Sequence, residues 1–502
     1  MNTENKTNKK GAAFRSDKFK RGTMATIFTV IFVVIVVLLN LVFTVLTDRF
    51  PSMNFDISAL KLNTLSEDAM NVAESVSEPV EIFLIGKESA YRGDDIYSTY
   101  GVQYSQVSNL ADKMREANPL ISVDYVDPDT SPDFVSQYSG DDLTTGKVLV
   151  RSEKRYRVLG VDDLFSVEQD QMTYQYIFYS KVDGALANAI HMVTLEEVPV
   201  IAVATGHEEV LDSASRAAFD SLMIASCFEV AEFNILTEDI PEAATVLMLP
   251  TPTTDYTLDE IAKINTFLSE EGRTGTHTLL VTAHPGQAEM PNLASLLEDW
   301  GMSVDTTAFV VETDTNSALS SGPQYIYANS TGTILTEEYP NLLAPYSAPI
   351  ELIFSNNSGI ATYSLIETNN TSYAVTNSTT EEELNNPETA SYITAAMAQK
   401  ITTGANTIKT NVVLVGNTMS FIDSFLSDTF SNKAYTADLM RYATDTSEND
   451  IGLSIAEVQT SQYDITATAF VCVAVGMGLF TILIPLAILI AGLVVFLKRR
   501  HL

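Results

Sequence analysis

Apolar residues follow two different distributions along this chain. Two long, uninterrupted apolar runs lie near the ends, at residues 24–46 and 469–497. Between them, short apolar runs alternate with stretches in which apolar residues recur every three or four positions. Short apolar runs predict β-strands and the longer period predicts helices, so the middle of the chain is expected to have an α/β fold.

Each long apolar run is able to cross a membrane as one helix. Residues 24–46 have only Asn40 and threonines as polar interruptions, and residues 469–497 carry no charge, with Pro485 among them. About 20 apolar residues suffice to cross the ~30 Å hydrocarbon core of a bilayer. The first run is longer than the apolar core of a signal peptide, and no small-residue cleavage motif follows it, so we expect an uncleaved anchor.

The charges separate the ends of the chain from its middle. The 502 residues include 29 Lys and Arg against 64 Asp and Glu, a formal net charge of −35. Seven basic residues lie in residues 1–21 and three at residues 498–500, whereas all but two of the acidic residues lie between the two apolar runs. The positive-inside rule therefore predicts cytoplasmic termini and an extracytoplasmic segment over residues 48–468. Such acidity argues against binding to nucleic acid.

The first part of the outer segment is expected to be a small domain over residues 80–195, preceded by a linker and a helix over 47–79. The predicted elements are strands at 80–85 and 121–126, helices at 97–117 and 132–138, a hairpin of strands at 147–151 and 155–159, and helices at 162–165 and 176–190. This order resembles the thioredoxin fold. The Cys-x-x-Cys motif is missing, which excludes thiol–disulfide exchange.

Residues 196–445 are expected to form a second, larger α/β domain. Strands are predicted at 198–205, 229–234, 245–249, 278–282, 350–354 and 412–415, and helices at 214–226, 258–270, 293–300, 421–425 and 434–443. Continuous apolar strands separated by helices indicate a parallel sheet covered on both faces. Residues 311–400 are rich in Ser, Thr and Asn and show no motif. A polar linker over 446–468, the span 469–497 and a basic tail over 498–502 complete the chain, which begins with a basic tail over 1–23.

Two loops are candidate ligand sites. Gly206-His207-Glu208-Glu209 and Gly416-Asn417 each follow the end of a predicted strand. The carboxyl ends of strands in α/β sheets are where ligands bind. His207 with the neighbouring glutamates has the side chains for metal binding or acid–base chemistry, but a single His beside acids is also typical of a hydrogen-bonded loop.

Other patterns for catalysis and cofactors are missing from the sequence. There is no Gly-x-Ser-x-Gly nucleophile motif, no Walker A motif and no His-x-x-x-His pair. Cys227 is expected to be a buried thiol, and Asp127-Pro128-Asp129 is expected to be a surface turn rather than a calcium loop. We therefore assign no catalytic, cofactor-binding or metal-binding residues and expect no enzyme activity. With only two cysteines, the chain also lacks a disulfide framework, which is compatible with the outside of a bacterial plasma membrane.

The order of these features resembles a known family, the GldG-like auxiliary components of ABC-type transport systems associated with gliding motility. The segments that carry the resemblance are 55–85, 121–129, 146–165, 186–209, 233–272 and 412–423. They read FDISALKLNTLSEDAMNVAESVSEPVEIFLI, ISVDYVDPD, GKVLVRSEKRYRVLGVDDLF, LANAIHMVTLEEVPVIAVATGHEE, FNILTEDIPEAATVLMLPTPTTDYTLDEIAKINTFLSEEG and VVLVGNTMSFID. The resemblance covers most of the outer part together with both spans.

The resemblance implies partners and a second fold assignment. Such proteins look to associate with a multi-span permease and a cytoplasmic ATPase. The second domain would be similar to the class I glutamine amidotransferase-like, or flavodoxin-like, sheet without its catalytic Cys and His. One departure is the turn after the helix of that domain, where the family's usual Gly-Gly is replaced by Gly272-Arg273-Thr274-Gly275.

Three functions follow as expectations. The first is a non-catalytic auxiliary subunit of an ABC transporter, docked on a permease through its two membrane helices. The second is an extracytoplasmic ligand-binding or sensory protein, although the short tails leave no room for a cytoplasmic output domain. The third is a surface hydrolase that uses His207 and nearby acids.

Overall fold

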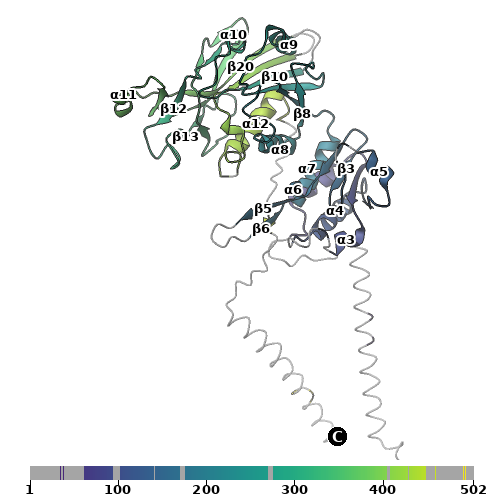
Figure 1. The fold of residues 1–502 in the computed structure, drawn as a ribbon. Helices are drawn as coiled ribbons and strands as arrows, with labels where there is room; N and C mark the ends of the chain where they lie inside the picture. The colour runs from purple at the N-terminus through teal and green to yellow at the C-terminus, as the bar shows by residue number, and fades with distance from the viewer. Residues whose placement is uncertain are drawn as a thin grey trace, which may run out of the picture. The chain divides into compact units, whose positions relative to one another are not determined.

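The computed structural model describes most of the segment between the two apolar runs. The described residues are 62–447, except for 94–95, 97–101, 139, 141, 170–175, 270–274, 404–406 and 428, together with Val34, Leu38, Val458, Gln459, Ile490 and Gly492. The chain divides into two compact units, Met1–Val193 with Ser454–Leu502, and Thr194–Leu453 (Figure 1).

The expected membrane spans fall outside the described residues, apart from four helical positions within them. Those positions are Val34, Leu38, Ile490 and Gly492. Among the helices that the structure does describe, none combines the length and the apolar character needed to traverse a bilayer.

The first unit is built around a four-stranded mixed sheet. Its strands are β1 (Val80–Ile85), β2 (Ile121–Val126), β3 (Val148–Arg151) and β4 (Tyr156–Leu159), in the spatial order β2-β1-β3-β4. Strand β1 is parallel to β2 and antiparallel to β3. The helices are α2 (Glu67–Ser75), α3 (Glu88–Arg92), α4 (Ser105–Ala117), α5 (Pro132–Ser136), α6 (Val161–Leu164) and α7 (Val182–Thr194).

Local chemistry explains where these elements begin and end. Ser66 caps α2, because its side chain accepts a hydrogen bond from the Ala69 amide. Arg155, in the β3–β4 hairpin, donates to the carbonyl of Met192 at the C-terminal end of α7, where a cation is favoured. Sheet residues such as Phe83 and Leu149 pack with side chains of α5 in a small apolar cluster.

Two helix predictions in this unit are wrong in part. Tyr176–Ser180 is strand β6, which pairs with β5 (Phe165–Gln169), and the helix begins only at Val182. The aromatic and β-branched residues of Tyr-Ile-Phe-Tyr favour a strand. Helix α4 begins at Ser105 instead of residue 97, after Tyr104, whose buried hydroxyl donates to the carbonyl of Gly146.

The second unit contains a large sheet with a parallel centre. Five mutually parallel strands lie in the order β21 (Thr407–Val415), β10 (Gly275–Thr282), β9 (Ala244–Pro250), β7 (Val200–Thr205) and β8 (Glu229–Asn234). Beyond β21 the sheet continues antiparallel with β20 (Ile393–Thr403), β18 (Ile360–Glu367), β16 (Ile350–Leu352) and β11 (Met302–Val304). The expected parallel sheet is therefore present, with an antiparallel extension that the sequence did not predict.

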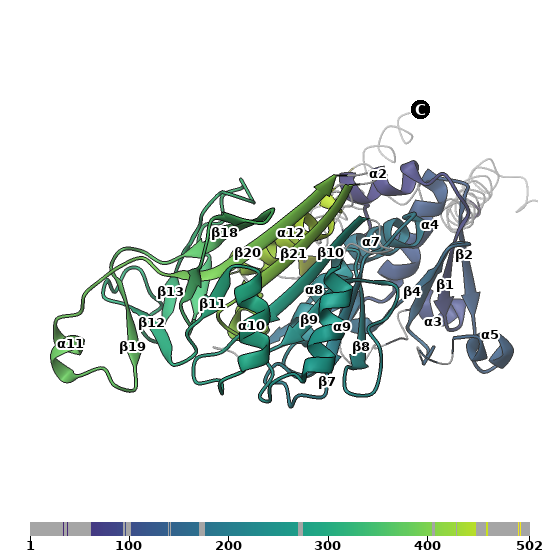
Figure 2. The ribbon, with the colours of Figure 1, turned by 90° about the horizontal axis from the view of Figure 1, so that it is seen from above.

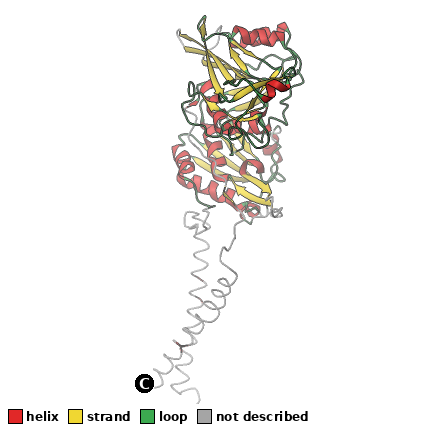
Figure 3. Ribbon diagram, turned by 90° about the vertical axis from the view of Figure 1, so that its left-hand side faces the viewer, coloured by secondary structure: helices red, strands yellow, loops and turns green. Residues whose placement is uncertain are grey.

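Helices cover both faces of this sheet, as expected. Helices α9 (Leu258–Leu268) and α10 (Pro291–Asp299) lie across one face (Figure 2), and α8 (Ala217–Ala225) and α12 (Asn432–Thr444) pack on the other. Successive residues of β7 alternate between the two apolar clusters, Ile201 on one face and Ala202 on the other. Figure 3 colours the strands yellow and the helices red.

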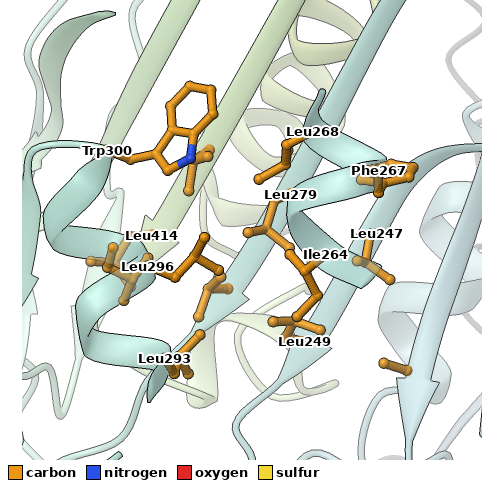
Figure 4. Close-up of a cluster of buried hydrophobic side chains, with 14 of the residues drawn as sticks. Leu247, Leu249, Ile264, Phe267, Leu268, Leu279, Leu293, Leu296, Trp300 and Leu414 are labelled. Carbon is orange, nitrogen blue, oxygen red and sulfur yellow. The ribbon is translucent and has the colours of Figure 1, made fainter. Parts of the chain in front are cut away.

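The cluster on the α9–α10 face is one of the two cores of this sheet (Figure 4). Its members include Ile264 and Phe267 from α9, Leu293 and Leu296 from α10, and Trp300 at the end of α10. Trp300 is the only tryptophan of the chain. It therefore reports on this core alone.

The region 311–400, in which the sequence shows no motif, contains several strands and one helix. Its further elements are β12 (Ala308–Glu312), β13 (Tyr325–Tyr327), β14 (Asn329–Ser330), β15 (Leu343–Pro345), β17 (Asn356–Asn357), β19 (Ser372–Thr376) and α11 (Glu381–Asn385). Strands β12 and β19 pair antiparallel, and so do β13 and β15. The helix predicted at 421–425 is wrong, because Met419–Phe421 forms only a 3-10 turn.

Candidate functional site

The first candidate loop follows β7 directly. Gly206 has φ +119°, and a Cβ there would lie 3.0 Å from Asn234 and from Leu236 in the next loop. Both the backbone angle and the close approach require glycine. The glycine therefore lets the chain turn sharply and bury the next side chain.

His207 is buried, with 3% of its surface exposed. Its Nδ1 lies 3.2 Å from Oγ1 of Thr254, and its Nε2 lies 3.4 Å from Oε2 of Glu260. The ring centroid is 4.2 Å from that of Tyr256. The imidazole thus packs against the start of α9 and does not face solvent.

Glu260 holds the first turn of α9 together. Its Oε2 accepts hydrogen bonds from the amide of Thr257 at 2.7 Å and from the hydroxyl of Thr257 at 2.8 Å, which forms a capping box. Burial by itself raises the pKa of Glu260, but the bonds from Thr257 and the nearby His207 outweigh burial and lower that pKa. The carboxylate is accordingly ionised at neutral pH.

Tyr256 completes this cluster from the same loop. Burial, followed by the charges of Glu209, Glu260 and Asp255, raises the pKa of Tyr256 well above its usual value. Its hydroxyl meets no hydrogen-bond partner among the described residues. The phenol is therefore neutral at physiological pH and acts as packing for His207.

The loops after β7 and β9 are joined by backbone hydrogen bonds. The carbonyl of His207 accepts from the amide of Thr253 at 3.0 Å and from its hydroxyl at 3.1 Å, and the amide of Val210 donates to the carbonyl of Thr251 at 2.9 Å. Strands β7 and β9 are neighbours at the point where the strand order reverses, the usual place of a ligand crevice in such a sheet. Here the paired loops and the His207 ring fill that place.

The two glutamates of the loop differ in burial and in hydrogen bonding. Glu209 is half-buried, and its Oε1 accepts a hydrogen bond from the amide of His207 at 2.8 Å. Glu208 is exposed, and its φ of +51° is uncommon for a residue with a Cβ. Only Glu208 therefore offers a free carboxylate to solvent in this loop.

The second candidate loop is equally tied to the fold. A Cβ on Gly416 would lie 2.2 Å from the carbonyl oxygen of Ala348, which places that backbone directly against the glycine. The side chain of Asn417 is buried. Its Nδ2 donates to the hydroxyl of Ser347 at 3.0 Å, and its Oδ1 accepts from the backbone amide of Ser420 at 2.8 Å. Asn417 therefore joins the end of β21 to the segment before β16.

A cluster of threonines connects the two loops. Thr251, after β9, is fully buried, and its Oγ1 lies 2.6 Å from that of Thr282 and 3.2 Å from that of Thr418. Its carbonyl accepts from Val210 of the first loop. The structure thus brings the predicted site residues to one edge of the sheet, and it joins them through Thr251.

The sequence did not identify the partners of His207. Thr254, Tyr256 and Glu260 lie 47 to 53 positions away, and only the adjacency of β7 and β9 brings them close. One signal was readable: Thr257-Leu-Asp-Glu260 has the spacing of a capping box and marks the start of α9. Cys227 is buried as expected. Across the described part of the chain, no three His, Cys, Asp or Glu side chains are placed to hold a metal ion.

Comparisons with known proteins identify no family. Neither a protein-family model nor a curated protein matches the sequence. The solved structures that resemble it include one described as "mmIFT52 N-terminal domain", with a TM-score of 0.37 and 13% sequence identity. That match covers 49% of this chain and 97% of the other. A likeness of this degree carries no argument about function.

Proposed function

We propose that the protein is a non-catalytic auxiliary subunit of an ABC transporter, with partners that are a multi-span permease and a cytoplasmic ATPase. The observation that carries this proposal is the ordered series of segments that resembles GldG-like proteins, flanked by two apolar runs at 24–46 and 469–497. In this proposal both runs are transmembrane helices in a bacterial plasma membrane. Both termini are then cytoplasmic, and residues 48–468 are outside.

The architecture of each unit supports the same family assignment. The chain order of β1, α4, β2, α5, β3, β4 and α7 is the order expected of a thioredoxin-like domain. The parallel sheet with helices on both faces supports a glutamine amidotransferase-like second domain. Fold alone does not determine function, so the sequence segments remain the main support.

The surroundings of His207 favour this proposal over a surface hydrolase. A general base has to reach a substrate proton within hydrogen-bond distance. His207 is 3% exposed and directs its two ring nitrogens toward Thr254 and Glu260. Its contacts suit a residue that holds α9 against β7.

Co-purification tests the proposed partnership. The full chain is crosslinked in intact cells, extracted in a mild detergent and captured through a tag. We expect a polytopic permease and an ATPase in stoichiometric amounts. Capture of the protein alone after crosslinking contradicts the proposal.

A span exchange shows whether docking runs through the membrane helices. Residues 24–46 and 469–497 are replaced by leucine-rich helices of equal length, which keep the protein anchored. If the native spans form the docking surface, the permease is lost while Trp300 fluorescence shows a folded second unit. Retention of the permease assigns docking to the outer part instead.

A further inference from the structure

A cavity lies between α10 and the carboxyl ends of β10 and β21, and its lining includes none of the residues that contact His207. Its volume is ≈ 320 Å³. The walls are mainly apolar, with Val281 from β10, Leu414 from β21, and Leu293 and Leu297 from α10. Figure 4 shows Leu293 and Leu414 facing the space between helix and sheet. Small, exposed Ala294 lines the cavity from α10.

The position and size of the cavity suit a small ligand. Sheets of this kind bind ligands outside the carboxyl ends of their strands. Ligand pockets of proteins begin at about 300 Å³ and combine apolar walls with a few polar groups. The cavity has this character, whereas the neighbouring place at β7 and β9 is filled by side chains.

The polar groups at the rim select the charge of that ligand. Glu289 and Asp305 line the cavity and are exposed, and the lining includes no Lys, Arg or His. Neither carboxylate has a basic partner among the ion pairs of the described residues. The rim is therefore negative and attracts cations.

The start of α10 does not offset this charge. Free amides at a helix N-terminus favour anions, but both carboxylate oxygens of Asp255 already accept bonds here. Oδ2 accepts from the Asn292 amide at 2.8 Å, and Oδ1 accepts from the Leu293 amide at 3.2 Å. An anionic head group would thus meet the two carboxylates of the rim, and Asp255 already occupies the amides of Asn292 and Leu293.

We propose that this cavity binds a small, mainly apolar molecule that carries a positive charge, such as a short alkylammonium ion. The apolar chain lies between α10 and β10, and the ammonium group lies at the rim beside Glu289 and Asp305. This site is independent of permease docking, so its failure in a binding test leaves the proposed function intact.

The single tryptophan provides the binding assay. Trp300 ends α10 and belongs to the same buried cluster as Leu293 and Leu297. The full-length protein in detergent is titrated with hexylammonium, 1-hexanol and hexanoate, which share one chain length and differ in charge. We expect a saturable change of Trp300 fluorescence, with hexylammonium binding about tenfold more tightly than hexanoate.

Two matched variants separate binding in the cavity from partitioning into detergent. Ala294→Phe places a ring in the cavity and should abolish the saturable change. Ser295→Phe puts the same ring on the next, exposed position of α10, which is not part of the cavity lining, and should leave it intact. Saturable binding that persists unchanged in Ala294→Phe overturns the proposal, as does the lack of a saturable change in the unaltered protein.

The rim charge is tested with substitutions that leave the core untouched. Glu289→Gln with Asp305→Asn should bring the affinity for hexylammonium within about twofold of that for 1-hexanol. Both residues are exposed, so this variant folds even where Ala294→Phe does not. An unchanged preference for hexylammonium in the double variant contradicts the assigned role of the rim.

Discussion

Glu260 links two elements through one carboxylate. It closes the first turn of α9 with Thr257 and lies 3.4 Å from Nε2 of His207 at the end of β7. Its pKa is lower in the folded protein than the ordinary 4.5. A lowered pKa means that the ionised form stabilises the fold at pH values above 4.5, and that this stabilisation is lost as the pH falls through the folded value.

Replacement of this carboxylate should therefore give a pH-dependent loss of stability. At pH 7, Glu260→Gln is expected to lower the free energy of unfolding by about 1–2 kcal/mol. The difference from the unaltered protein should shrink as the pH falls below 4.5. Melting followed by Trp300 fluorescence measures it, and Asp259→Asn, exposed in the same turn, is the control with little effect. A difference in unfolding free energy between the unaltered protein and Glu260→Gln that stays constant from pH 7 to pH 3 contradicts a stabilising role of the Glu260 charge.

Replacement of Tyr256 is expected to change the free energy of unfolding at pH 7 less than replacement of Glu260. Its hydroxyl is buried without a hydrogen-bond partner among the described residues, so the fold loses little when the oxygen is removed. Tyr256→Phe should change the free energy of unfolding by less than about 1 kcal/mol at pH 7. Because the pKa of Tyr256 is raised in the fold, the unaltered protein should lose stability above pH 10, and the variant should lose less. Melting at pH 7 and pH 10.5 checks both statements.

Element by element, most strands and helices were readable from the sequence, and the exceptions have physical causes. Strand β20 has the sequence Ile-Thr-Ala-Ala-Met-Ala-Gln-Lys-Ile-Thr-Thr, whose alanines and methionine do not favour a strand on their own. It is extended because β18 and β21 pair with it on both sides. Tertiary pairing of this kind is not encoded within the segment itself.

Another part of the region 311–400 has a sequence pattern that is typical of a hairpin turn. Ser358 and Gly359 join β17 to β18 with φ angles of +52° and +85°, as a two-residue hairpin turn requires. Glycine in such a loop between two extended segments is readable from sequence. The candidate loops were likewise found from their positions after β7 and β21, whereas their partners depend on which strands become neighbours.

Gly416 shows how tightly the end of β21 is docked. A Cβ there would lie 2.2 Å from a backbone oxygen of Ala348, which cannot move aside as a flexible side chain does. Gly416→Ala is expected to cost about 2–3 kcal/mol or more of unfolding free energy, because overpacking against a backbone oxygen shifts the backbone. Chemical denaturation followed by Trp300 fluorescence measures the loss.

Gly359→Ala is the comparison for backbone strain without a steric clash. Its φ of +85° is unfavourable for alanine, but a Cβ there would meet nothing within 4 Å. We expect a loss of about 1 kcal/mol, the typical cost of this conformation for one residue. Equal losses for both variants would mean that contact with Ala348 does not constrain the loop.

For the whole molecule, the charge distribution makes the strongest prediction. Ten of the 29 lysines and arginines lie before the first apolar run or after the second, whereas all but two of the acidic residues lie between the runs. Basic segments stay on the cytoplasmic side of bacterial membranes. If both runs span the bilayer, the described residues that lie between the runs are outside, and the α11 helix is open to reagents in the medium.

Single cysteines test this topology directly. In a Cys227→Ser, Cys472→Ser background, Asn385→Cys places a thiol on the exposed α11 helix, and Ser16→Cys places one in the basic tail. A membrane-impermeant maleimide added to intact cells should label only Asn385→Cys, because the tail lies behind the membrane. Both should react after the cells are lysed. Labelling of Ser16→Cys in intact cells would put the amino terminus outside, and the paired spans could then no longer present both basic tails to a cytoplasmic ATPase.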